Sequence, residues 1–437
     1  MTKSLAFLTI ISLFIAGCGG GGSGGSDSTQ APASNAGGNS SSDDSSSDDS
    51  SSDDSSSDNS GSNNTTLLLD NLANNIFIPN YQNVVTSAGE LASDTGILAT
   101  YCSSIGTSEE ANALNNAQNA WRSVMSDVQA TEMHAVGPAI ANGETLRKRM
   151  LSFSDGSIST CGIDEIAVLA SEADFAIGSR ASNQLGMGAA GYLLFNEDLN
   201  HSCSALVPTT ADWNDLPDND RKTARCEAAK LILRDVRDAA EQISDQWDAN
   251  GGNFISDFTL LGTSGEYLQE TTDALFYIEV GGKDKKLAIP LGLRTCTNNS
   301  CPESVESKYS RNSLQNIRDN TETFLKIFEG SEGRSFDDVI AEEGFEDVNQ
   351  SFRTAVADVI TAIDAIDTSL YDQALSIDTS AAATQCANAF ANPETLDADL
   401  PACSLNGLMK RITDLMKIDF VTIVGVNLPS GVQSDND

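Results

Sequence analysis

Histidine is scarce in this chain of 437 residues, where only His134 and His201 occur. The imidazole ring is the side chain best suited to general-base catalysis and neutral metal ligation near pH 7, so a histidine-based dyad or zinc site is not expected. The sequence also lacks a Gly-rich phosphate loop, a Gly-x-Ser-x-Gly nucleophile elbow and a His-Glu-x-x-His pair. The common sequence signatures of nucleotide binding, serine hydrolysis and zinc peptidase activity are therefore absent.

Neither histidine lies in a strong metal-ligand pattern. Glu197 and His201 are four residues apart and would share one face of a helix, but two ligands make a weak site. That helix is also expected to end before Cys203. Glu132 and His134 are two residues apart and point to different sides, so His134 is interpreted as a hydrogen-bonded histidine at a helix end. We predict no metal site, no cofactor and no catalytic residue.

Basic residues are few: 25 Lys and Arg stand against 63 Asp and Glu, for a formal net charge of −38. An acidic body repels nucleic acid and anionic lipid and tolerates cationic partners or metal ions. No nucleic-acid partner is expected. An acidic surface kept soluble in a salty medium explains the charge equally well.

A long hydrophobic run is also missing, since the apolar stretch from Leu5 to Ile15 is too short to span a bilayer. Lys3 precedes it, and Ala16-Gly17-Cys18 follows it in a pattern that resembles a bacterial lipoprotein box. Residues 1–17 are therefore predicted to be a lipoprotein signal peptide, with the lipid on Cys18. Two or more acyl chains would attach the chain stably to a membrane. The alternative is an ordinary signal in which the cysteine is incidental.

Residues 18–66 combine the lipidated Cys18 with a Gly-rich stretch and Ser-Ser-Ser-Asp-Asp repeats. Such a segment has almost nothing apolar to bury, so we predict a disordered spacer that holds a folded domain off a membrane. A calcium-binding acidic repeat is the alternative, but the Gly and apolar positions of a coordinating turn are missing. Gly19, rather than Asp, after the cysteine favours the outer membrane of a bacterial envelope, on its periplasmic or surface face.

The other eight cysteines form an even set, which predicts disulfides in an oxidising compartment. No Cys-x-x-Cys pair suggests a metal–thiolate site. Connectivity cannot be read from sequence, but close spacing favours three pairs and leaves a fourth by elimination. The expected pairs are Cys296–Cys301, Cys386–Cys403, Cys203–Cys226 and Cys102–Cys161.

Residues 67–437 have the composition of a globular protein large enough for two packed halves. Apolar residues recur at helical spacing in many segments, whereas only Ala288–Leu293 and Val421–Leu428 are strand candidates. We predict an all-α body of two packed helical-bundle halves, approximately 67–250 and 251–437. The expected helical segments are Leu67–Ile76, Ala111–Val128, Ile163–Ile177, Ala224–Trp247, Tyr267–Val280, Leu314–Phe328 and Phe352–Ile366. Helix breaks are expected at Pro208–Asp218, Asn250–Gly252 and Gly281–Gly282.

Several short blocks occur in an order that is similar to the imelysin family, also called imelysin-like or insulin-cleaving metallopeptidase-like proteins. The resemblance covers nearly all of 67–437. It implies a mainly helical body of two bundle-like halves in an exported bacterial protein, with links to iron regulation or uptake and, for some members, peptidase activity. The blocks are Ile78-Pro79-Asn80-Tyr81-Gln82, Trp121-Arg122, Gly137-Pro138, Cys161-Gly162-Ile163-Asp164, 185–195, 286–292, 305–310 and 424–427.

The family's hallmark, Gly-x-His-x-x-Glu, falls on residues 186–191 when the following Tyr-Leu-Leu-Phe block is aligned. Gly186 is kept, but Gly188 and Gly191 replace the His and the Glu. Glycine supplies neither a metal ligand nor a general base. Each glycine also costs a helix about 1 kcal/mol relative to Ala. We expect the compensation to be close helix packing or, alternatively, space for a ligand.

Further family positions are matched, and the resemblance implies that they lie near a cleft. A structural role is an alternative for each: a core tryptophan, a buried Arg–Asp pair, and serines that cap the next helix together with Ser313. These candidate cleft residues are Trp121, Arg122, Asp164, Ser307 and Ser310.

The sequence therefore favours a membrane-anchored, imelysin-like lipoprotein that is a non-catalytic binding or accessory protein, with a link to iron acquisition. Its expected partners are the membrane, through the N-terminal lipid, and an unknown ligand or envelope protein. The alternative is a metal-dependent envelope peptidase of the imelysin type, and a purely structural envelope protein is a third reading.

Overall fold

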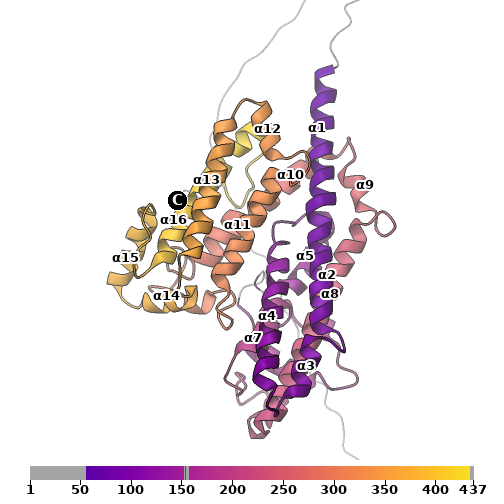
Figure 1. Cartoon of the computed structure of the whole chain (residues 1–437), viewed down its shortest axis with the longest axis vertical. Helices are drawn as coiled ribbons and strands as arrows, with labels where there is room; N and C mark the ends of the chain where they lie inside the picture. The colour runs from indigo at the N-terminus through magenta and orange to yellow at the C-terminus, as the bar shows by residue number, and fades with distance from the viewer. Residues whose placement is uncertain (1–55, 152, 154–156, 434–437) are drawn as a thin grey trace, which may run out of the picture. The chain divides into compact units, whose positions relative to one another are not determined.

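A computed structural model describes residues 56–151, 153 and 157–433, in which the regular secondary structure is entirely helical (Figure 1). The predicted signal peptide 1–17 and Cys18 lie outside these residues. Helix α1 begins at Ser56, so helical structure starts within the stretch 18–66 expected to be a linker. None of the described helices is long and apolar enough to cross a membrane.

The first half of the described chain is a bundle built around two helices that lie side by side, α2 (Ile78–Ala92) and α8 (Asp218–Trp247). Apolar residues recur at helical spacing on the buried face of α2, as at Tyr81, Val84 and Ala88. The helix α1 (Ser56–Leu72) leads through the π-helical turn Ala73–Phe77 into α2. The other helices of this half are α3 (Ile97–Ser104), α4 (Glu110–Gln129), α5 (Ala141–Met150), α6 (Thr160–Leu169) and α7 (Gly186–Phe195).

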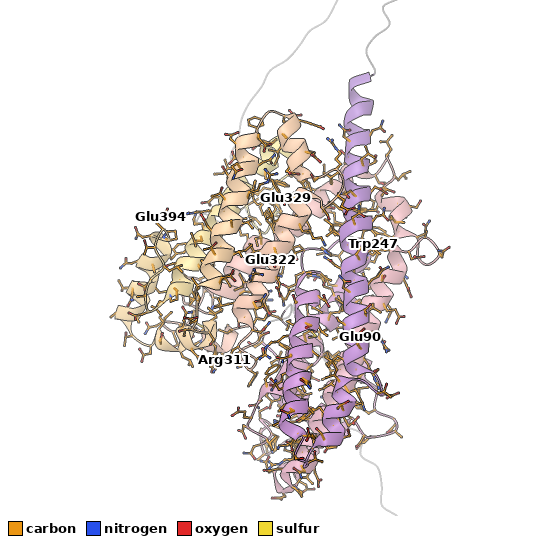
Figure 2. The ribbon with its side chains drawn as sticks, viewed as in Figure 1. Glu90, Trp247, Arg311, Glu322, Glu329 and Glu394 are labelled. Carbon is orange, nitrogen blue, oxygen red and sulfur yellow. A yellow bond between two sulfur atoms is a disulfide. The ribbon has the colours of Figure 1, made fainter. Side chains whose placement is uncertain are left out.

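Aromatic rings pack around Trp247, the last residue of α8, which is labelled in Figure 2. The short helix α9 (Phe254–Phe258) folds back so that Phe254 and Phe258 meet the indole edge-on at centroid distances of 4.8 and 5.0 Å. Such perpendicular ring pairs are favourable beyond the apolar area they bury.

The second half packs the long helices α11 (Ser313–Glu329), α13 (Glu346–Asp364) and α16 (Pro401–Leu415) together. Phe328 and Phe352 meet in its core with ring centroids 4.6 Å apart. The π-helical segment η8 (Ile278–Ala288) lies against α11 and α16. The remaining helices are α10 (Ser264–Leu275), α12 (Phe336–Glu342), α14 (Leu370–Ser376), α15 (Ser380–Ala391), the π-helical turn Met416–Phe420 and α17 (Val421–Val424).

The two halves are joined by buried polar contacts as well as by apolar packing. Asn71, in α1, donates to the carbonyl oxygens of Gly330 and Arg334 at 2.6 and 2.9 Å. Asn320, in α11, donates to the carbonyl oxygen of Gln129, the last residue of α4, at 2.9 Å. The predicted all-α architecture of two packed halves is confirmed.

The two strand candidates are wrong. Ala288 is the last residue of η8, 289–292 form turns and 293 is a bend. Val421–Val424 is helical and ends at Gly425 in the left-handed conformation. A short apolar run has the same appearance in a buried strand and in a buried helical turn, so periodicity cannot separate them. The expected break at Gly281–Gly282 is also wrong, because both glycines lie inside η8.

Within the described residues, four disulfides link the eight cysteines that follow Cys18. The pairs Cys296–Cys301 and Cys386–Cys403 are confirmed. The predicted Cys203–Cys226 and Cys102–Cys161 pairs are wrong, and the bonds are Cys102–Cys226 and Cys161–Cys203. Helix α3 packs on α8, which brings Cys102 to Cys226 across 124 residues of sequence, so spacing alone selected the wrong partners.

Candidate binding cavity between the two halves

The glycines of α7 allow this helix to approach α4 closely. A Cβ atom built on Gly191 would lie 2.8 Å from Cζ2 of Trp121, which is closer than real contacts of this kind. The indole Nε1 of Trp121 donates to the carbonyl oxygen of Met187 at 3.1 Å. Gly186 begins the helix with φ +73°, a conformation that favours glycine. Close helix packing, one of the two features expected to offset the cost of these glycines to helix stability, is therefore present at Gly191.

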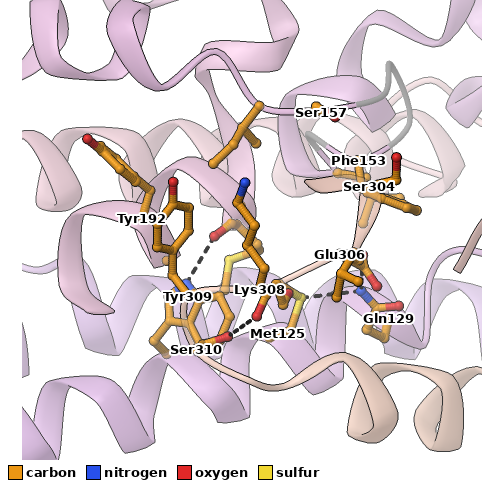
Figure 3. Close-up of a pocket in the computed structure, with 18 of the residues that line it drawn as sticks. Met125, Gln129, Phe153, Ser157, Tyr192, Ser304, Glu306, Lys308, Tyr309 and Ser310 are labelled. Carbon is orange, nitrogen blue, oxygen red and sulfur yellow. Dashed lines mark hydrogen bonds between the residues drawn. The ribbon is translucent and has the colours of Figure 1, made fainter. Parts of the chain in front are cut away.

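A cavity of about 60 Å³ lies beside this contact, between the two halves (Figure 3). Trp121 and Met125 of α4, and Met187, Gly188 and Gly191 of α7, line it from the first half. Across it runs the segment 303–310, which includes two predicted cleft residues, Ser307 and Ser310. A volume of this size accommodates about four or five water-sized groups.

The segment 303–310 is held in an unusual backbone conformation. Ser307, within the segment, and Arg311, directly after it, have φ values of +55° and +57°, which non-glycine residues adopt at an energetic cost. The hydroxyl of Ser307 accepts a hydrogen bond from Asn316 at 3.1 Å, and Ser310 donates to the Ser307 carbonyl at 3.1 Å. Ser313 donates to the carbonyl of Glu306. These bonds fix the segment as a rigid wall of the cavity.

The expectation that Ser307, Ser310 or Ser313 caps the next helix is wrong. The N-cap position of α11 is Asn312, and it makes no side-chain capping bond. The three hydroxyls are used within the segment and by Asn316 instead, because the chain reverses sharply before α11 begins.

A buried ionic cluster closes one end of the cavity. The ammonium of Lys286, in η8, lies 2.5 Å from a carboxylate oxygen of Glu132 and 3.2 Å from one of Glu306. It also donates to the side-chain oxygens of Gln129 and Asn320. The side chains of Lys286 and Glu132 are 1% and 2% exposed. Every donor position of this ammonium is therefore used inside the protein.

Glu306 has further partners in the same cluster. Gln129 and Asn316 donate to its carboxylate at 3.1 and 2.9 Å. Burial raises the pKa of Glu306, and the ammonium of Lys286 opposes that rise. A second cation, Arg147, donates to the carbonyl oxygen of Glu132 at 2.9 Å. The cluster thus joins two carboxylates and two cations.

Asp164 belongs to a different buried network. It accepts hydrogen bonds from the hydroxyl of Tyr192 at 3.0 Å and from the backbone and hydroxyl of Ser202 at 2.7 and 2.8 Å. Its cation is Arg225 of α8, at 3.8 Å. The alternative of a buried Arg122–Asp164 pair is therefore wrong, because α6 packs on α8. Arg122 lies over the ring of Phe195 at 4.9 Å and donates to Asn119. Neither residue lines the cavity.

Lys308 contrasts with these satisfied charges. Its half-buried side chain lines the cavity, and its Nζ lies 5.3 Å from the centre of the Tyr309 ring. Within the described residues this ammonium has neither a hydrogen-bond nor an ion-pair partner. Burial lowers the pKa of Lys308, and the carboxylate of Glu303 opposes that shift without forming an ion pair.

The residues present do not fit a resident metal ion. No group of three or more His, Cys, Asp or Glu side chains in the described parts of the chain is arranged to hold one. At the cavity, Gly188 and Gly191 offer no side-chain ligand atoms, and Glu306 is engaged by the ionic cluster. His134 is buried elsewhere, 2.8 Å from the amide of Asn80, where burial lowers its pKa to about 3. The helix that would align Glu197 with His201 ends at Phe195.

Sequence reasoning did not single out Gln129, Glu132, Lys286, Glu306 or Lys308 as site residues. A usable signal was present, because Lys286 and Lys308 lie in blocks 286–292 and 305–310 that carry the family resemblance. A charged residue in a short block with apolar neighbours is a candidate for burial with a specific partner.

Comparisons with known proteins give consistent results. A family model described as imelysin matches residues 77–396. An imelysin-like protein from Psychrobacter arcticum 273-4 superposes with a TM-score of 0.61 at 14% identity, covering 84% of this chain and 98% of that one. A protein described as an iron-regulated protein A precursor, from Parabacteroides distasonis ATCC 8503, gives 0.53 at 15% identity, covering 81% and 95%. At these identities the two structures show a shared fold. No curated protein matches the chain.

Proposed function

The chain belongs to the imelysin family, and from that premise we propose that it is a non-catalytic binding or accessory protein of the bacterial envelope. The observation that carries this proposal is the cavity between the two halves. Trp121, Gly188 and Gly191 are part of its wall, and the family resemblance implies metal-binding side chains at the two glycine positions. A pocket with apolar walls and a few convergent polar groups is suited to holding a small ligand.

The chemistry of the wall argues against hydrolysis. Activation of water needs a general base or a metal ion with an open coordination position. Glu306, a carboxylate at the cavity, is bound by Lys286, Gln129 and Asn316. The space beside Gly191 is filled by Trp121, so a longer side chain there would displace the indole.

The test is an assay for peptide cleavage. The purified, tag-free chain carrying Cys18→Ser, which prevents lipid attachment, is incubated with unfolded insulin chains with and without a chelator. We expect no cleavage under either condition. Cleavage that the chelator abolishes would contradict the proposal and favour the metal-dependent peptidase.

We also propose that Cys18 carries a lipid that anchors the protein to a membrane, at the outer membrane, with residues up to the start of α1 as the spacer. The lipoprotein-like sequence around Cys18 supports this proposal. In cell fractionation, wild-type protein is expected with the membranes and the Cys18→Ala variant in the soluble fraction. Equal distribution of the two would contradict the anchor.

The link to iron acquisition is proposed from the family and from the name of one structural neighbour, an iron-regulated protein A precursor. The amount of protein per cell is expected to change when iron is withheld from the culture. A constant amount across iron-replete and iron-limited growth would contradict this link.

A further inference from the structure

We propose that the cavity between the two halves binds a small carboxylate with a short apolar tail, and that Lys308 is the residue that contacts the carboxylate. This inference rests on the proposed binding function and specifies its ligand class. The observation behind it is an ammonium that lines an apolar cavity and has no partner among the described residues.

The charge that the cavity offers to a ligand comes from the charged side chains that no other protein group already neutralises. Lys286 is 1% exposed and surrounded by four side-chain oxygens, so its charge is used within the protein. Glu306 is bound by the same lysine and by two amides. Glu303, which also lines the cavity, is exposed and does not pair with Lys308. Lys308 is therefore the cation left to a ligand.

The position of Lys308 is built into the fold. The preceding residue, Ser307, has φ +55° and is tied down by Asn316, while Ser310 closes a turn onto the Ser307 carbonyl. A strained backbone persists only where its surroundings enforce it, and such positions cluster at ligand sites. Figure 3 shows the hydroxyl of Tyr309 on the same side of the cavity as Nζ of Lys308. That hydroxyl also has no hydrogen-bond partner in the described chain.

The other walls define the rest of the ligand. Trp121, Met125 and Met187 present apolar surface, and the volume of about 60 Å³ admits only a few heavy atoms. A half-buried ammonium forms a charge-assisted hydrogen bond with a carboxylate, and Tyr309 can donate a second. A dianionic phosphate would need more cations than this cavity offers, and a cationic ligand would be repelled by Lys308. A short aliphatic monocarboxylate fits these conditions.

The experiment uses propionate as the probe, with propionamide and propylammonium as uncharged and cationic analogues of similar size. Binding to the purified Cys18→Ser chain is followed by ligand-observed NMR. We expect propionate to bind with a dissociation constant of about 1 mM or below, at least tenfold more tightly than either analogue. Tighter binding of propylammonium, or no binding of propionate at tens of millimolar, would overturn the inference.

Variants locate the contact. Lys308→Met is expected to weaken propionate binding at least tenfold, whereas Lys308→Arg keeps it within about threefold because the positive charge remains. Lys410→Met is the matched control: this lysine lies on α16, pairs with Asp414 and should leave binding unchanged. Unaltered binding in Lys308→Met, with circular dichroism showing that the variant folds, would overturn the assignment.

The outcomes separate this inference from the proposed function. Preferential binding of propylammonium would overturn the carboxylate inference, but the proposed binding function would stand, with a cationic ligand. Chelator-sensitive cleavage of insulin chains by the same preparation would instead remove the proposed function itself.

Discussion

Two lysines near the cavity are in opposite situations: Lys286 lies behind the lining residues Gln129 and Glu306, and Lys308 lines the cavity itself. Lys286 is enclosed by two carboxylates and two amide oxygens, and it joins η8 to α4, α11 and the segment before α11. Lys308, on that same segment, faces apolar side chains without an ion-pair partner among the described residues. Removing one partner of a buried ion pair leaves an uncompensated charge and is costly, whereas an ammonium without an ion pair has no such contact to lose.

The largest loss of stability is expected from Lys286→Met, which removes the ammonium at the centre of the buried ionic cluster. Removing the ammonium leaves Glu132 and Glu306 buried with one cation fewer, and such losses cost roughly 3–5 kcal/mol. Unfolding in urea should therefore shift to much lower denaturant concentrations. Lys308→Met is the matched variant and should change the free energy of unfolding by less than about 1 kcal/mol, since no ion pair is lost. Equal losses in the two variants would contradict the distinction.

A smaller loss of stability is expected at the cavity wall where α7 packs on α4. Gly191→Ala places a Cβ atom 2.8 Å from Trp121 and should reduce stability by about 1–3 kcal/mol through overpacking. The control is Gly265→Ala in α10, where a Cβ would meet no atom within 4 Å. That variant should gain up to about 1 kcal/mol from its better helix propensity. Thermal unfolding of both variants measures the difference, and a neutral Gly191→Ala would mean that the indole can move freely.

The smallest effect is expected in the pH dependence of the free energy of unfolding, through Glu306 of the ionic cluster. Because the pKa of Glu306 is raised in the fold, its contribution to stability is complete below the ordinary value of 4.5 and is lost as the pH rises through the folded pKa. Glu306→Gln removes this contribution, so its stability should fall less than that of the wild type as the pH rises across that window. At pH 7 the two proteins should differ by about 1 kcal/mol or less.

Urea unfolding at a series of pH values measures this difference. If the free energy of unfolding changes with pH in the same way in the wild type and in Glu306→Gln, the pKa of Glu306 is not raised in the fold and the prediction is wrong.

The long helices could be predicted from the sequence, whereas the partners of the buried charges could not. Helical periodicity identified the long helices, since the buried face of α2 is a local pattern of apolar residues. The resemblance pointed to Trp121, Ser307 and Ser310, which do lie at the cavity, and to Asp164 and Arg122, which do not line it. The roles of the charged residues were not predictable, because they depend on partners far away in the chain.

Lys286 and Lys308 illustrate this limit. Each lies in a block that carries the family resemblance, but only the fold brings Glu132 to Lys286 across 154 positions while leaving Lys308 without such a partner in the described chain. The exchanged disulfides have the same origin, since Cys102 meets Cys226 through the packing of α3 on α8. Long-range pairing is set by helix packing, which periodicity alone does not encode.

We propose that the cavity between the two halves holds its ligand without a metal centre. Calorimetric titration of the metal-free, tag-free chain with Zn²⁺, and separately with Fe²⁺ under anaerobic conditions, tests it most directly. Neither ion should bind saturably. Tight one-to-one binding that is lost on mutation of residues lining the cavity would contradict it.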